Sequence, residues 1–418
     1  MNVPRALGPA LLCATLASTL SGCSGTLDSL GTNSRSNGGS GGVSYSLGRV
    51  APPAQYPNAF ANLQPPPSET EITNKLKLAF EQLFEQSILT QGIYNPQAGD
   101  QAVVQDIRHN DVRTEGIGLA MLITVELGQR DYFDPLWRFS KANLQLNSGD
   151  GQGYFKSNCG EETKGTPCLD SYGMQQFVLA LMLANSRWGS TTAMPYARDA
   201  LDLLDLLQNG VGGTFDAETH LVREEPSLDP VNYTRSSLEM PAAYWYWAQA
   251  TGNPFWKVAA DAARKNLVAG SDATSTGLWP IRSNFDGTPV PDSLTFTAET
   301  YRTHLNLALD ALWGNANADE ARVADRVLGF FAGIDNYGQT FTTDGTPIDS
   351  NPAQALISVN GALTVAAPAS TDRAAFVKAV WAQQIPSGDN RYYDGLMYMM
   401  SLLIMSGRMQ VQPPSQLF

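Results

Sequence analysis

The feature that most constrains this chain is a strict alternation, from Thr70 onward, of two kinds of predicted helix. The first kind is amphipathic, and in its first example Ile72, Leu76 and Phe80 form a single apolar stripe at helical spacing. The second kind is apolar on nearly all sides, as in 115–127, and this pattern predicts a helix that is buried all round.

Six helices of each kind are expected. The amphipathic helices are expected near 72–83, 132–147, 195–207, 255–268, 318–331 and 371–384. The apolar helices are expected near 115–127, 173–188, 236–250, 300–313, 353–366 and 394–406. An inner ring of apolar helices wrapped by an outer ring buries both kinds, which predicts an all-α fold, an (α/α)6 barrel or six-hairpin toroid, over residues 56–418. A helical solenoid is the alternative, but it would show capping repeats and a more regular period.

In such a barrel the inner helices run parallel, so their N-terminal ends gather at one end. Polar and aromatic segments precede these helices, at 108–115, 168–172, 232–235, 296–302, 349–352 and 390–394. Functional residues are usually carried by loops on a rigid scaffold, so the site is expected where these segments meet.

The N-terminus reads as a targeting segment. Arg5 precedes the apolar stretch 6–20, which is too short and too interrupted to span a membrane. It ends in Leu20-Ser21-Gly22-Cys23, which resembles a bacterial lipoprotein cleavage box. We therefore expect a signal peptide over 1–22, a lipid on Cys23, a flexible Gly/Ser-rich tether over 23–55, and a location on the periplasmic side of the outer membrane. An ordinary signal peptide with a chance cysteine is the alternative.

Cysteine and histidine content limits the other kinds of site. Cys159 and Cys168 are expected to form a disulfide in an oxidising periplasm, and two free thiols are the alternative. The three histidines show no metal-ligand spacing, and no glycine-rich phosphate loop is present. We therefore expect neither a metal nor a cofactor.

The net charge of −13 argues against a nucleic-acid partner, because no basic patch stands out to neutralise phosphates. It suits a neutral substrate. Beyond that substrate and the membrane reached through the lipid, we expect no partner, and a monomer.

Two acids open inner helices at the expected site. Hydrolysis of a glycosidic bond by inversion needs one carboxylic acid to protonate the leaving oxygen and a second carboxylate to activate water. Glu115, at the start of 115–127, fits the acid, and Glu299, at the start of 300–313, fits the second carboxylate. The alternative is that each acid only favours its helix through the helix dipole.

Tyrosines are frequent near the same helix starts. They are Tyr154, Tyr172, Tyr233, Tyr301, Tyr392 and Tyr393. Sugars stack their apolar faces on aromatic rings, so a site rich in tyrosine suits an oligosaccharide. The alternative is that these rings belong to the core.

Read together, these segments resemble glycoside hydrolase family 8, in particular its branch of reducing-end xylose-releasing exo-oligoxylanases. The stretches that carry the resemblance are Tyr56-Pro-Asn-Ala-Phe60, Asn110-Asp-Val-Arg-Thr-Glu-Gly116, Phe133-Asp-Pro-Leu-Trp-Arg138, Gly153-Tyr-Phe155, Ser186-Arg-Trp-Gly189, Tyr301-Arg302, Leu305-Asn-Leu-Ala-Leu-Asp310, Ile385-Pro-Ser-Gly388 and Arg391-Tyr-Tyr-Asp-Gly395. The resemblance implies an (α/α)6 barrel that hydrolyses β-1,4-linked glycans by inversion without a metal.

The resemblance also implies roles for single residues. The general acid of the family falls on Glu115, and its general base, an aspartate, falls on Glu299, three residues before Arg302. An aspartate that contacts the sugar at the scissile bond falls on Tyr172, with Asp170 two residues earlier. The residues then expected to bind substrate are Asp111, Arg113, Tyr154, Asp170, Tyr172, Tyr233, Tyr301, Arg302, Tyr392 and Tyr393.

The departures from the family pattern lie at the site. They include Met174 and Gln175 in place of two acids, and Arg235 in place of an aspartate. We therefore expect an inverting hydrolase rebuilt for its own β-1,4-linked glycan. The alternative is a carbohydrate-binding lipoprotein that has lost catalysis and serves exopolysaccharide assembly. A lyase or epimerase on the same barrel is a remoter alternative, because three histidines leave little for its chemistry.

Overall fold

The computed structural model describes residues 47–157, 168–210, 212–226, 231–335, 338–351, 353–367 and 373–412. The expected signal peptide, most of the expected tether, the lipid site Cys23 and the disulfide partner Cys159 lie outside these ranges. No helix in the described ranges is long and apolar enough to cross a membrane.

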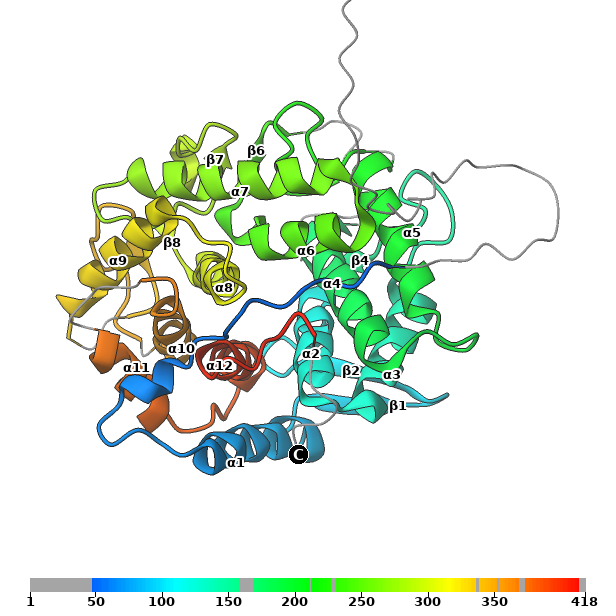
Figure 1. Ribbon diagram of the computed structural model, residues 1–418, viewed down its shortest axis with the longest axis horizontal. Helices are drawn as coiled ribbons and strands as arrows, with labels where there is room; N and C mark the ends of the chain where they lie inside the picture. The colour runs from blue at the N-terminus through cyan, green and yellow to red at the C-terminus, as the bar shows by residue number, and fades with distance from the viewer. Residues whose placement is uncertain are drawn as a thin grey trace, which may run out of the picture. The chain divides into compact units, whose positions relative to one another are not determined.

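The described residues contain twelve α-helices, which alternate between an outer and an inner position (Figure 1). The outer helices are α1 (Glu69–Phe80), α3 (Arg130–Phe139), α5 (Tyr196–Asn209), α7 (Pro254–Asp272), α9 (Ala318–Ala332) and α11 (Arg373–Ala382). The inner helices are α2 (Thr114–Leu127), α4 (Ser171–Trp188), α6 (Pro241–Thr251), α8 (Ala298–Leu312), α10 (Gln354–Leu363) and α12 (Arg391–Met405). Each corresponds to one predicted helix.

The inner helices close into a ring. In chain order each packs against the next, from α2 to α4 and on to α12, and α12 packs against α2. Figure 1 shows α8, α10 and α12 end-on near the middle, with the outer helices around the rim. The six-hairpin arrangement predicted from the alternation of helices is therefore confirmed.

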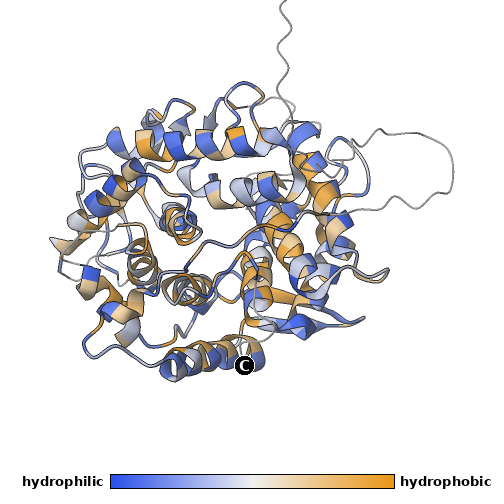
Figure 2. Cartoon of the chain, viewed as in Figure 1, coloured by the Kyte–Doolittle hydropathy of each residue, from blue (hydrophilic) through white to orange (hydrophobic). Residues whose placement is uncertain are grey.

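Burial separates the two rings. Every residue of α2 except Glu115 is buried, whereas α1 buries only the stripe Ile72, Leu76, Ala79 and Phe80. Figure 2 shows hydrophobic colour on much of α2 and mixed colour on α1. The hydrophobic effect, at roughly 25 cal/mol per Å² of apolar area buried, therefore acts on all sides of an inner helix and on one side of an outer helix.

Short antiparallel strands occupy the connections. They are β1 (Tyr94–Gln97) with β2 (Gln101–Asp106) and β3 (Asp111–Val112), β4 (Lys156–Ser157) with β5 (Cys168–Leu169), β6 (Tyr233–Thr234) with β7 (Ser283–Asn284), and β8 (Thr295–Phe296) with β9 (Phe341–Thr342). Helical periodicity did not predict them. They lie in the segments that precede inner helices. β3 lies directly before α2, β5 before α4, and β8 before α8, and β6 lies before the short turn that leads into α6.

Local sequence accounts for the helix ends. Ser68 caps α1 by accepting a hydrogen bond from the amide of Glu71, whose carboxylate accepts one from the amide of Ser68. Gly128 ends α2 with φ of 77°, a left-handed conformation that costs glycine little.

The helix α6 starts later than predicted. The sequence pattern predicts a helix from Ser236, but residues 236–238 form a single 3-10 turn and α6 begins at Pro241. Proline lacks the amide hydrogen that an interior helical position must donate, and it disfavours helical conformation in the residue before it. Pro241 is therefore tolerated only in the first turn.

Both described chain ends cover the end of the barrel at which the inner helices finish. This terminal clasp consists of Leu47–Val50 and Met409–Gln412. Gly48 donates to the carbonyl of Ala250 over 2.8 Å, and the Arg49 Nε donates to Gln412 Oε1 over 2.9 Å. The indole of Trp313, which follows α8, donates to the carbonyl of Met409 over 2.9 Å.

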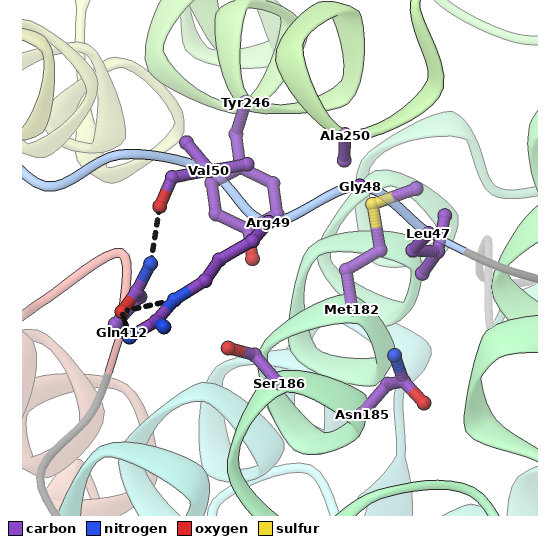
Figure 3. Close-up of a pocket in the computed structure, with 10 residues that line it drawn as sticks. All are labelled: Leu47, Gly48, Arg49, Val50, Met182, Asn185, Ser186, Tyr246, Ala250 and Gln412. Atoms are coloured by element: carbon purple, nitrogen blue, oxygen red, sulfur yellow. Dashed lines mark hydrogen bonds between the residues drawn. The ribbon is translucent and has the colours of Figure 1, made fainter. Parts of the chain in front are cut away.

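A cavity of about 630 Å³ lies beside the clasp (Figure 3). It is lined by Leu47–Val50, by Met182, Asn185 and Ser186 from the end of α4, by Tyr246 and Ala250 of α6, and by Gln412. The packed part of the chain therefore begins before Tyr56, the expected start of the barrel domain, because Val50 is buried and Gly48 bonds to α6.

Candidate active site

The starts of the inner helices meet at the other end of the barrel. Asp170, which caps α4, accepts a hydrogen bond from Thr114, the first residue of α2. The hydroxyl of Tyr393 in α12 donates to the carbonyl of Ala298, the first residue of α8. The backbone amide of Ala355 in α10 donates to Asp394 Oδ1 in α12 over 3.2 Å. The expectation that the segments before the inner helices converge is confirmed.

Arg302 bridges the two candidate catalytic acids. Its Nη1 donates to Glu115 Oε1, and its Nη2 donates to Glu299 Oε2 over 2.9 Å. Glu299 and Arg302 lie one turn apart in α8, whereas Glu115 comes from α2 across the inner ring. We refer to Glu115 and Glu299 as the carboxylate pair.

The two carboxylates have opposite electrostatic environments. The Glu115 side chain is 19% exposed and that of Glu299 is 49% exposed. Burial raises the pKa of Glu115, and the charge of Arg302 opposes this rise only in part. Arg302 lowers the pKa of Glu299, with a further contribution from Arg235, and this outweighs the effect of burial. The pKa values of the two carboxyls are thus shifted in opposite directions, which is the pattern expected of an acid and base pair.

Tyr172 supports the bridging guanidinium. The Arg302 Cζ lies 4.4 Å from the centre of the Tyr172 ring, within range for a cation–π interaction. Both side chains are almost fully buried. Tyr172 thus lies at the carboxylate pair but contacts it through Arg302.

Asp170 caps the start of α4 through its side chain. Its Oδ1 accepts from the amide of Tyr172 over 3.0 Å, and its Oδ2 accepts from the amide of Gly173 over 2.9 Å and from Thr114. Burial raises the pKa of Asp170, while these hydrogen bonds oppose the rise. Its described bonds are those of an N-cap that joins α4 to α2.

Tyr392 and Tyr393 lie in the first turn of α12, which is part of the same site. A Cβ on Gly116 would lie 2.2 Å from the Tyr392 hydroxyl, so only glycine fits after Glu115. That hydroxyl is buried without a hydrogen-bond partner among the described residues. The charges of Glu115 and Glu299 add to the effect of burial in raising the pKa of Tyr393.

Asp111 and Arg113 form an ion pair beside the carboxylate pair. The Arg113 Nη2 lies 3.1 Å from Asp111 Oδ2 and 3.5 Å from Asp106 Oδ2. Arg113 is also among the charges that lower the pKa of Glu299.

Tyr301 and Tyr233 lie at the edges of the cluster. Tyr301 is buried and donates to the carbonyl of Gln339, and its ring lies 6.5 Å from that of Tyr393. Tyr233 is partly exposed, and the Arg282 guanidinium lies 5.5 Å from its ring.

Tyr154, which the sequence predicted to bind substrate, lies in the core. Its ring is fully buried, and its hydroxyl donates to the carbonyl of Leu206 in the outer helix α5 over 3.3 Å. It also accepts a bond from buried Thr214 over 3.4 Å. Tyr154 therefore packs the core under α5, as the alternative interpretation of these aromatics held.

Two further arginines and a glutamate, none of them among the expected catalytic or substrate-binding residues, extend the charge network. Glu224 accepts hydrogen bonds from both Arg235 and Arg282, and Arg235 Nη1 donates to Glu299 Oε2 over 3.0 Å. We call Glu224, Arg235 and Arg282 the Glu224 cluster. Arg235 stands in a segment expected at the site, but nothing in the sequence distinguishes Glu224 or Arg282, which lie in long connections.

The arrangement suits acid and base chemistry on a bond held between two carboxyl groups. The described residues contain no group of three or more His, Cys, Asp or Glu side chains placed to hold a metal ion. Of the two cysteines expected to pair, only the backbone of Cys168, in β5, is described.

Comparisons with known proteins identify the family of the chain. Residues 68–407 match the family described as glycosyl hydrolases family 8. The chain is 30% identical to a reducing end xylose-releasing exo-oligoxylanase from Halalkalibacterium halodurans, over 83% of this chain and 92% of the relative. It is 26% identical to endoglucanase C from Ruminiclostridium cellulolyticum, over 85% of this chain and 75% of the relative.

A solved structure agrees as well. The xylobiose complex of a family 8 enzyme from Teredinibacter turnerae superimposes with a TM-score of 0.78 at 30% identity, covering 86% of this chain and 98% of that one. With the family match extending over both rings of helices and the carboxylate pair, the chain belongs to family 8 of the glycosyl hydrolases.

Proposed function

We propose that the protein hydrolyses β-1,4-linked poly- or oligosaccharides of the xylo-oligosaccharide or glucan type, with inversion. The observation that carries the proposal is the carboxylate pair: two acids with opposite pKa shifts, bridged by Arg302 where the inner helices begin. The names of the relatives, an exo-oligoxylanase and an endoglucanase, support this substrate class.

Glu115 is the general acid in this proposal. Its raised pKa keeps a proton available for the oxygen of the leaving sugar. Glu299 is the general base, because its lowered pKa keeps it ionised and able to accept a proton from the attacking water. Tyr172 and Arg302 hold the pair, and Arg113, Tyr392 and Tyr393 surround it.

The stereochemistry of the first product tests the proposal. The purified protein is incubated with xylo-, cello- and chitosan oligosaccharides, and the anomeric protons are followed by NMR from the first minutes. Release of an α-anomer from a β-linked substrate is expected. A β-anomer would contradict inversion, and saturable binding without turnover would support the binding-protein alternative instead.

The dependence of activity on pH is a second prediction. Glu115 must be protonated, so kcat/KM is expected to fall as the pH rises through its raised pKa. Glu299 must be ionised, so kcat/KM is expected to fall as the pH drops through its lowered pKa. The activity should therefore form a broad bell whose acidic limb belongs to Glu299. A profile in which Glu115→Asp leaves the alkaline limb in place would contradict the assignment.

We also propose that Cys23 carries a lipid that anchors the protein in the bacterial cell envelope, on the periplasmic side of the outer membrane. The support is the sequence Leu20-Ser21-Gly22-Cys23. Cells expressing Cys23→Ser are expected to lose the protein from the outer-membrane fraction, and Cys13→Ser, within the expected signal peptide, is the matched control. Retention of the Cys23→Ser protein in that fraction would contradict the proposal.

A further inference from the structure

Two arginines hold the Glu299 carboxylate, and both bind the same one of its oxygens. Its Oε2 accepts a hydrogen bond from Arg302 Nη2 over 2.9 Å and from Arg235 Nη1 over 3.0 Å. Arg302 lies on the same helix as Glu299, whereas Arg235 precedes the turn before α6. Its Oε1 accepts no hydrogen bond from the residues that the structure describes, so that oxygen is left for another proton donor.

Arg235 is itself fixed by the Glu224 cluster. Its Nε donates to Glu224 Oε1 over 2.6 Å, and its Nη2 also donates to that oxygen. Arg282 holds Glu224 from the other side, with Nε donating to Oε2 over 2.8 Å and Nη2 donating to Oε1 over 2.9 Å. The Glu224 side chain is mostly buried and serves two guanidinium groups, so it has little freedom to move.

We infer that Glu224 and Arg235 are positioning residues for Glu299, in that Glu224 orients Arg235 and Arg235 fixes the Oε2 of Glu299 so that its Oε1 faces the attacking water. The inference rests on the proposed function, since it takes Glu299 as the base.

The chemistry explains why such a device is needed here. A glutamate has one more rotatable bond than an aspartate, so its carboxylate samples more positions, and the Glu299 side chain is half exposed. A misplacement of about 1 Å at a reacting group can lower the rate about a hundredfold. Two charge-assisted hydrogen bonds to one oxygen restrict this freedom. Glu224 also balances the charge of Arg235, so that Arg235 orients Glu299 without acting as an unpaired cation beside it.

Charged and titratable groups face Glu299 from several elements of the barrel. Arg302 and Arg235 donate to it, Arg113 lowers its pKa from the start of α2, and Glu115 and Tyr393 face it from α2 and α12. Only Arg235 among them is held by Glu224. The effect of changing Glu224 on Glu299 should therefore pass through Arg235.

The direct test measures the pKa of Glu299 by NMR and does not depend on turnover. The purified protein is labelled with 13C at the glutamate carboxyl carbon, the Glu299 signal is identified by its loss in Glu299→Gln, and its shift is titrated with pH. In Arg235→Gln a cation is lost, so the pKa of Glu299 is expected to rise. In Glu224→Gln the charge of Arg235 is no longer balanced, so the pKa of Glu299 is expected to fall. In the double variant most of the Glu224→Gln effect should disappear.

Kinetics supply the second readout. Both single variants are expected to lose about tenfold to a hundredfold in kcat with little change in KM. The acidic limb of the pH profile should move to higher pH in Arg235→Gln and to lower pH in Glu224→Gln. Arg322→Gln, which removes an exposed arginine paired with Asp272, is the matched control and should leave kcat and the Glu299 titration unchanged.

Equal titrations in all variants, or shifts in the same direction, would overturn the inference. Opposite shifts in a protein that hydrolyses no substrate would uphold the positioning role and contradict the proposed function.

Discussion

Replacing Glu115 by glutamine is expected to lower kcat on oligosaccharides by about a hundredfold to ten-thousandfold, the range for loss of a general acid. An amide cannot supply the proton that the leaving sugar oxygen needs. Because Arg302 keeps its bond to Glu299, the fold should survive. Initial rates of product release, together with the melting temperature, measure both effects.

A substrate that needs no acid sharpens this test. Fluoride leaves a glycosyl fluoride without full protonation, so Glu115→Gln should retain most of the wild-type rate on the fluoride of a suitable disaccharide. Glu126→Gln is the matched control, since it makes the same change in the same helix at the other end of the barrel. A Glu115→Gln variant with near wild-type turnover of oligosaccharides would exclude Glu115 as the acid.

Replacing Glu299 by glutamine is expected to lower the rate of hydrolysis of oligosaccharides and of the glycosyl fluoride alike. Attack by water needs a base whichever group leaves, and the amide of glutamine cannot accept the proton. The loss should again reach about a hundredfold to ten-thousandfold. Parallel assays of the two substrates separate this pattern from that of Glu115→Gln.

The aspartate variant adds a geometric control. Glu299→Asp keeps a carboxylate but draws it back by about one C–C bond, away from Arg235 and Arg302. We expect about a tenfold to hundredfold loss, smaller than that of Glu299→Gln. If Glu299→Asp were faster than the wild-type protein, the site would be built for an aspartate, and the role of the Glu224 cluster would have to be revised.

The fold was predictable because hydrophobic periodicity reports burial directly. An inner helix such as α2 is apolar on every side and an outer helix such as α1 on one, so the two rings could be separated without long-range information. The start of α6 was missed because 236–240 was counted with the apolar run that follows it, while the constraint comes from the ring of Pro241.

The site was predictable only where it coincided with a helix start. Glu115, Glu299 and Arg302 lie in or next to first turns, and parallel inner helices must bring such turns together. Tyr154 follows a turn at Gly153, yet its ring points toward Leu206 in α5, and residue type alone gives no direction. Glu224 and Arg282 meet from connections 58 positions apart, a contact that no local pattern encodes.

The terminal clasp determines from which end the protein can be held. Arg49 and Gln412 are hydrogen-bonded at the end of the barrel where α4 and α6 finish, whereas the carboxylate pair lies where the inner helices begin. A bead or a fusion partner joined directly at Leu47 or Gln412 is therefore attached on the side away from the carboxylates. Protein immobilised in this way leaves the carboxylate pair accessible to a long polymer in solution.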